Sequence, residues 1–143
     1  MIGVLEDGDN LINALNRCLK KAATSDCEIA EVYKWDGQMM DIAVMMKAPD
    51  RLVSAKVLVC PSKNAVDIAR CGRFDQIVTV GYKDYDTVTL SASGDSTLSV
   101  CFQREITPLV GFTPPIGEVI ATSTGTDELT MLMCAVMRCV GIV

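Results

Sequence analysis

Two loops in this chain carry residue types that could bind a small ligand. The first follows the apolar run 1–5 and consists of Asp7, Gly8, Asp9 and Asn10. The second follows the apolar run 55–60 and consists of Pro61, Ser62, Lys63 and Asn64. Each precedes an expected helix, and ligands of open parallel sheets bind past the carboxyl ends of strands, where the amides that open a helix can receive an anion. We therefore predict an anion site at these loops, with Lys63 adding charge; plain caps and turns are the alternative.

The residues that are missing exclude many other chemistries. The chain has no His, which removes the Ser-His, Cys-His and His-metal mechanisms. It has no phosphate-loop motif and no G-x-G-x-x-G fingerprint. Its seven Cys include no C-x-x-C pair. Cys60 stands before a helix start, where the pKa of a thiol can fall, but Val66 and Asp67 occupy positions where an Arg would be needed, so we expect a structural thiol.

Composition limits the class of protein. Of 143 residues, 50% are hydrophobic, which is enough for one folded domain over residues 1–143. The 13 basic and 18 acidic residues give a net charge of −5, which argues against a nucleic-acid partner. No apolar stretch reaches 18 residues, so we expect no membrane span. An odd number of Cys in apolar settings, with no signal peptide, predicts free thiols and a cytoplasmic location.

The first half of the chain predicts alternating strands and helices. We expect strands at 1–5, 28–35, 55–60 and 76–80 from their apolar runs and alternation. Helical spacing of apolar residues over 11–22, with Asp9 or Asn10 as the cap, predicts the first helix. The Met-rich segment 38–47 could form a helix or a strand, and we favour a helix because Met is a good helix former and Gly37 and Pro49 bracket the segment. The segment 61–71 predicts a short helix, which completes a parallel βαβ unit.

The second half changes character after Gly81. Clean alternation over 87–93 and 97–102 predicts a β-hairpin, and 116–121 could add an edge strand. Thr126 is a helix cap before a final helix that is apolar on nearly every side. The expected fold is α/β, a single three-layer domain with a mixed, mostly parallel sheet and a C-terminal β-hairpin plus a buried helix.

The segment 4–11 resembles the opening motif of the NYN branch of the PIN-like nucleases, since a strand runs through an acidic loop into a helix. The resemblance implies that Asp7, with Asp9, ligates a divalent metal, and Asp41 resembles the second acidic position of that family. Mg²⁺ or Mn²⁺ takes such oxygen ligands and can activate water. The family's further acidic cluster would fall at 60–64, where this chain has no carboxylate.

The segment 57–101 resembles the end of the central domain of Mur ligases. The resemblance is carried by the strand 77–81, which ends in Gly, and by a hairpin of matching spacing at 86–93 and 98–101. That family binds ATP through a phosphate loop, which this chain lacks. The resemblance therefore implies a small remnant of the domain without ligase activity.

These observations favour a non-catalytic α/β module that acts through protein partners or an anionic, nucleotide-like ligand, with no cofactor. The alternative is a metal-dependent nuclease that uses Asp7, Asp9 and Asp41 with Mg²⁺ or Mn²⁺. One sheet face covers only about half of a helix, so the final apolar helix needs a second cover. We therefore expect a homo-oligomer, most simply a twofold dimer.

Overall fold

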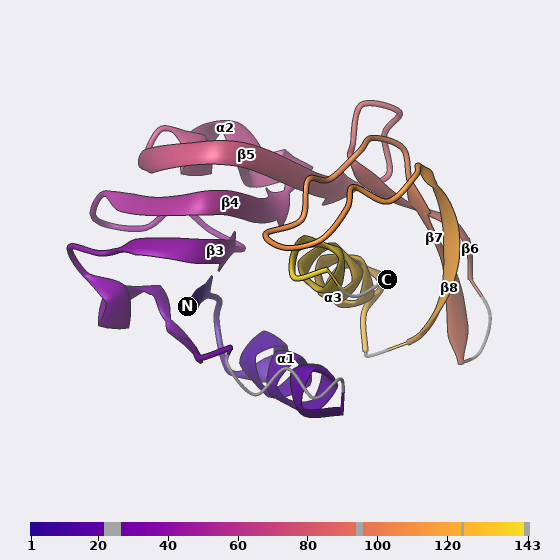
Figure 1. The fold of residues 1–143 in the computed structure, drawn as a ribbon, viewed down its shortest axis with the longest axis horizontal. Coiled ribbons are helices and arrows are strands. Elements are labelled where there is room, and N and C mark those ends of the chain that lie inside the picture. The colour runs from indigo at the N-terminus through magenta and orange to yellow at the C-terminus, as the bar shows by residue number, and fades with distance from the viewer. Residues whose placement is uncertain (22–26, 94–95, 124, 142–143) are drawn as a thin grey trace.

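An eight-stranded sheet forms the centre of the computed structural model, which describes residues 1–21, 27–93, 96–123 and 125–141 (Figure 1). In chain order the strands are β1 (Ile2–Leu5), β2 (Ile29–Glu31), β3 (Met39–Met45), β4 (Val53–Pro61), β5 (Gly72–Gly81), β6 (Val88–Ser93), β7 (Thr97–Phe102) and β8 (Gly117–Thr122). Their order in the sheet is β2-β1-β3-β4-β5-β6-β7-β8. Pairing is parallel from β2 to β6 and antiparallel from β6 to β8. This confirms the mixed, mostly parallel sheet.

Helices cover both faces of the sheet, as predicted for three layers. Helices α1 (Asn10–Lys21) and α3 (Asp127–Cys139) pack with the larger hydrophobic core on one face. The other face is covered by the short helix α2 (Ala65–Ala69) and the 3₁₀ turn η1 (Val32–Trp35), and a second turn, η2 (Ser62–Asn64), precedes α2. In the described part of the chain, no helix is long and apolar enough to cross a membrane.

The prediction of a helix over 38–47 is wrong, because this segment forms the strand β3. It lies between β1 and β4 and pairs in parallel with both. Four consecutive residues, from Ile42 to Met45, are buried, as expected for a central parallel strand covered on both faces. The preference of Met for helices is a weak prior that packing between two strands overrides.

The strand predicted over 28–35 is only partly present. Residues Ile29–Glu31 pair with β1, and the chain then turns into η1. The turn buries Val32 and Trp35, and the Trp35 indole N–H donates to the carbonyl of Ile2 at 3.4 Å. Burial of these two side chains against the sheet ends the strand early.

The remaining elements follow the sequence closely. Strands β4 and β5 are parallel and are connected by α2, which confirms the βαβ unit. Strands β6 and β7 pair antiparallel, and β8 adds to β7 as an edge strand. Thr126 caps α3, with its Oγ1 accepting the Leu129 amide at 3.1 Å. The loop tip 94–95 lies outside the described residues.

The sheet curls around α3. Figure 1 shows α3 in its hollow, with β3, β4 and β5 on one side and β6, β7 and β8 on the other. Met131, Leu132 and Val136 of α3 are completely buried. Most of the cover that an all-round apolar helix needs therefore comes from this chain's own sheet.

Candidate ligand-binding cleft

The structure brings the two predicted loops to one edge of the sheet. Strands β1, β3 and β4 are parallel, so the residues after Leu5, Met45 and Pro61 emerge on the same side. The Asn64 side-chain amide donates to the carbonyl of Met46 at 2.7 Å, which ties the loop after β4 to the end of β3. The sequence placed these loops after strands, and the parallel register makes them neighbours.

A cleft with a volume of about 870 Å³ opens at this edge between α1 and the start of α3. We call it the carboxyl-edge cleft. Strand order reverses here, because the chain leaves β1 through α1 to reach β2 and later returns to β3 on the other side of β1. Such a switch point is where ligands of open α/β sheets bind. Its polar lining comes mainly from Glu6, Asp7, Asn10, Asn13, Asn16, Arg17, Thr126 and Glu128.

The start of α1 is already occupied by a carboxylate of this chain. Both oxygens of Glu6 accept helix amides, from Leu11 and Ile12, at 2.9 Å each. The side chain that caps α1 is thus Glu6 rather than Asp9 or Asn10. An external anion would have to displace Glu6 to reach these amides. Anion binding by the helix start, which the loop 7–10 suggested, therefore has no support in this geometry.

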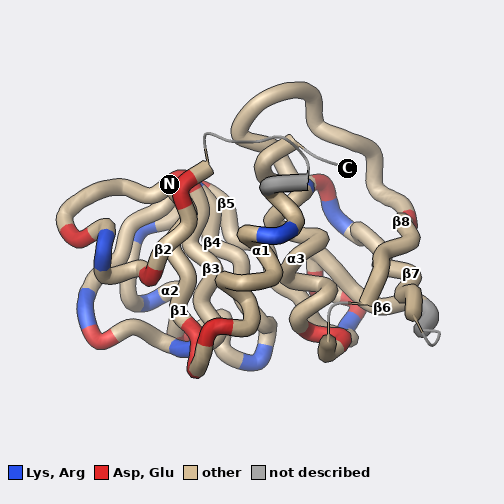
Figure 2. The backbone as a smooth tube through the Cα atoms, turned by 90° about the horizontal axis from the view of Figure 1, so that it is seen from below, with Lys and Arg blue, Asp and Glu red and all other residues tan. Residues whose placement is uncertain are grey.

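Two lysines contact acidic residues that line the cleft. Lys47, just after β3, bonds to Asp7 at 2.6 Å, and this contact raises the pKa of the lysine. Lys63, just after β4, lies 3.5 Å from Glu128 at the start of α3. Figure 2 shows basic and acidic positions together along this edge of the molecule. The side chains of Asp7, Lys47 and Lys63 are at least half exposed, whereas Glu128 is less so. Both ion pairs can therefore exchange partners readily.

Asp7 and Asp41 do not converge. Strands β1 and β3 run parallel with Leu5 opposite Met45, so Asp7 follows the carboxyl end of its strand, whereas Asp41 lies near the amino end of β3. Asp41 accepts the amino group of Met1 at 2.7 Å and lies 3.3 Å from Lys56. These contacts lower the pKa of Asp41, chiefly through the hydrogen bond from the amino terminus. A metal held jointly by Asp7 and Asp41 has no support in this geometry.

Asp9 is exposed, and its carbonyl accepts the Asn13 amide in the first turn of α1. Among the described residues, no three His, Cys, Asp or Glu side chains are grouped closely enough to hold a metal ion. Asp41 is therefore separated from the loop that carries Asp7 and Asp9, and the described residues group no third acidic side chain with that pair.

Cys60 is buried at the end of β4. Burial, with a smaller contribution from Asp86, raises the pKa of its thiol to about 12. A thiol with this pKa stays protonated at neutral pH and is a poor nucleophile. This agrees with the expectation of a structural thiol.

Sequence reasoning missed Asp86, a completely buried carboxylate in the turn after β5. Its Oδ2 accepts the Lys83 amide at 3.0 Å, while Oδ1 has no hydrogen-bond partner. A Cβ at Gly81 would come within 2.3 Å of this carboxylate and 2.6 Å of the Ser62 hydroxyl, so only Gly fits there. Alternation marks residues buried in strands, but no pattern marks an acid buried in a turn.

Comparisons with known proteins give this chain no relatives from which a role could be transferred. No family model matches the chain, and neither a curated protein nor a solved structure matches it.

Proposed function

We propose that this chain is a non-catalytic α/β module that binds a small anionic ligand, nucleotide-like in size, at the carboxyl-edge cleft. One observation carries the proposal. Lys47 and Lys63 come from two neighbouring strand ends, and each is held by a carboxylate that lines the cleft. A phosphate could replace Asp7 and Glu128 as the partner of these lysines, because exposed ion pairs contribute only about 0–1 kcal/mol each.

The absence of His from the sequence and the protonated state of Cys60 support a role in binding rather than catalysis. The likeness to Mur ligases fits the same proposal, as a remnant without ligase activity. We also propose that the module is cytoplasmic and works as a homo-oligomer. The metal-dependent nuclease is the alternative function, and it would have to rely on Asp7 and Asp9 without Asp41.

A thermal-shift titration with ADP tests the proposed ligand site. ADP should raise the Tm of the wild type, and Lys47→Ala should abolish this shift. Asp7→Asn frees Lys47 from its partner and should tighten ADP binding up to about fivefold. Asp36→Asn is the matched control, because Asp36 also forms a half-exposed 2.6 Å ion pair, with Arg51, away from the cleft.

The results distinguish the anion site, the exchange of partners at Lys47 and the nuclease. If ADP and inorganic phosphate leave the Tm unchanged at millimolar concentration, the anion site is wrong. If Asp7→Asn weakens ADP binding as Lys47→Ala does, Asp7 contacts the ligand and an exchange of partners at Lys47 is wrong. A Tm shift with Mn²⁺ that vanishes in Asp7→Asn would favour the nuclease.

A further inference from the structure

Within the described residues, one edge of strand β8 has no neighbouring strand. The amide of Ser123, just after β8, donates to the carbonyl of Ser96, just before β7, which fixes the hydrogen-bonding phase of this pair of strands. In an antiparallel pair, every second residue of a strand forms main-chain hydrogen bonds with the same neighbour. The main-chain groups directed toward β7 are therefore those of residues 117, 119, 121 and 123. Glu118, Ile120 and Thr122 therefore direct their N–H and C=O groups toward the open edge.

This edge carries few of the features that prevent strands from pairing. Natural edge strands are kept short or carry Lys, Pro or bulges. At the opposite edge, β2 has only three residues and is followed at once by η1. Strand β8 has six residues and contains no Pro or basic residue, and Ile120 on it is 74% exposed. Between residues 106 and 126 Glu118 is the only charged residue, and the tube in Figure 2 is uncoloured along almost all of this stretch.

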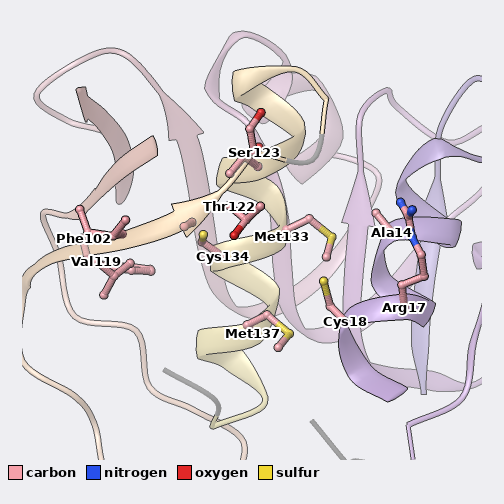
Figure 3. Close-up of a pocket in the computed structure, with 13 residues that line it drawn as sticks. Ala14, Arg17, Cys18, Phe102, Val119, Thr122, Ser123, Met133, Cys134 and Met137 are labelled. Atoms are coloured by element: carbon pink, nitrogen blue, oxygen red, sulfur yellow. The ribbon is translucent and has the colours of Figure 1, made fainter. Parts of the chain in front are cut away.

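A groove lies beside β8 and could accommodate an added strand. It has a volume of about 750 Å³ and is lined by β8, α3 and α1. Figure 3 shows its floor on α3, with Cys134 on the side toward β8 and Met133 and Met137 on the side toward Cys18 of α1. Val119 and Ala121 of β8 are half-buried against this core. A strand that continued the sheet past β8 would place alternate side chains over this apolar floor.

The sequence of β8 is complementary to itself around Ile120. Consider two copies of β8 paired antiparallel, with Ile120 of one copy opposite Ile120 of the other. Glu118 of each copy then lies opposite Thr122 of its partner, on either side of the twofold axis. The three pairs formed by Glu118, Ile120 and Thr122 would then each exchange two main-chain hydrogen bonds. No carboxylate faces another, whereas a pair centred on Glu118 would oppose like charges. Complementarity of this kind favours a second copy over an unrelated strand.

We propose that two copies of this chain pair through β8, antiparallel and centred on Ile120, to form one continuous sheet of sixteen strands from two eight-stranded halves. This inference rests on the homo-oligomer proposed above and specifies its interface, and it is independent of the ligand. Each Ile120 would pack on the other, and Val119 and Ala121 of each copy would help to cover the groove of its partner.

Proline at position 120 tests the interface, because the register directs the Ile120 amide to the open edge and away from β7. Ile120→Pro should leave the fold intact and raise the dimer Kd, measured by sedimentation over a concentration series, at least about tenfold. Ile120→Lys should do the same by placing two charges opposite each other. Leu52→Lys is the matched control, since Leu52 is 81% exposed and lies before β4.

The outcomes are distinct. If wild type remains a monomer at high concentration, both the homo-oligomer and its interface are wrong. If wild type dimerises and both Ile120 variants dimerise equally well, the homo-oligomer stands but the β8 interface is wrong. If Ile120→Pro fails to fold by circular dichroism, Ile120→Lys alone decides. Hydrogen exchange at the Ile120 amide should also slow as protein concentration rises, and unchanged exchange in a dimer would exclude β8.

Discussion

Removing the carboxylate of Glu6 should destabilise the start of α1, the helix that borders the carboxyl-edge cleft. Both oxygens of Glu6 accept first-turn amides, from Leu11 and Ile12, at 2.9 Å. These amides have no partner within the helix, so in Glu6→Ala they must turn to water. The carboxylate also lies at the positive end of the helix dipole, where negative charge is stabilising.

The size of the effect follows from these two contributions. A lost cap typically costs about 1 kcal/mol, and a lost charge at a helix start about 0.3–1 kcal/mol. Because Glu6 bonds two amides in a part-buried setting, we expect Glu6→Ala to lower the free energy of unfolding by about 2 kcal/mol. This corresponds to a fall in Tm of about 6 °C for a chain of this size. Glu6→Gln keeps an oxygen acceptor but loses the charge, and should cost about 1 kcal/mol.

Urea unfolding at pH 7 measures both variants, with an unchanged slope as the condition for comparing them. Glu105→Ala, which removes an exposed glutamate between β7 and β8, is the control and should stay within about 0.5 kcal/mol of wild type. Sulfate should recover more stability in Glu6→Ala than in wild type, because the freed amides can donate hydrogen bonds to an anion. A loss below about 0.5 kcal/mol in Glu6→Ala would refute this account of the helix start.

Two further predictions concern Asp41 and the thiols. Asp41→Asn should cost about 1 kcal/mol at pH 7, a figure reduced for the partial exposure of its contact with the amino group of Met1. Since the pKa of Asp41 is lowered in the folded state, its contribution is complete above the ordinary value of 3.8 and is lost as pH falls through the lowered value. The free energies of unfolding of wild type and Asp41→Asn should therefore converge in acid. A difference between them that stays constant down to pH 2 would contradict this. Burial raises the pKa of Cys60 and Cys139 to about 12, so neither should react with a thiol reagent at pH 8 until the chain unfolds. Denatured protein should then titrate seven thiols, and five or fewer would show that some are oxidised.

Periodic patterns in the sequence predicted most elements of the fold. Helix α1 and the hairpin of β6 and β7 carry regular apolar spacing, and both are present. Strand β3 was missed because its residues have no clear period. A strand buried on both faces is apolar throughout, and Met residues in such a run favour a helix when neighbours are ignored.

The position of the two loops was predictable, since both follow strands and lie at one edge of the sheet, whereas their role in binding stays a prediction. The charge arrangement at these loops was not predictable, because it depends on contacts between residues far apart in the chain. Lys47 pairs with Asp7 and Lys63 with Glu128 only after the sheet and α3 have formed. Glu6 was missed as a cap because the usual rule examines the residue next to the helix, and this carboxylate reaches back from further upstream.

The proposed dimer follows from strand β8 rather than from helix α3. The sequence argument for a dimer assumed a sheet that covers one side of the last helix, but the sheet curls and buries Met131, Leu132 and Val136 completely. A sheet that curls only partway around a helix must end in an edge beside that helix, and β8 is this edge. In the described part of the chain, the curl that covers α3 therefore leaves β8 with one edge that no strand covers, and a second strand at that edge would pair with its main-chain groups and cover the rest of α3.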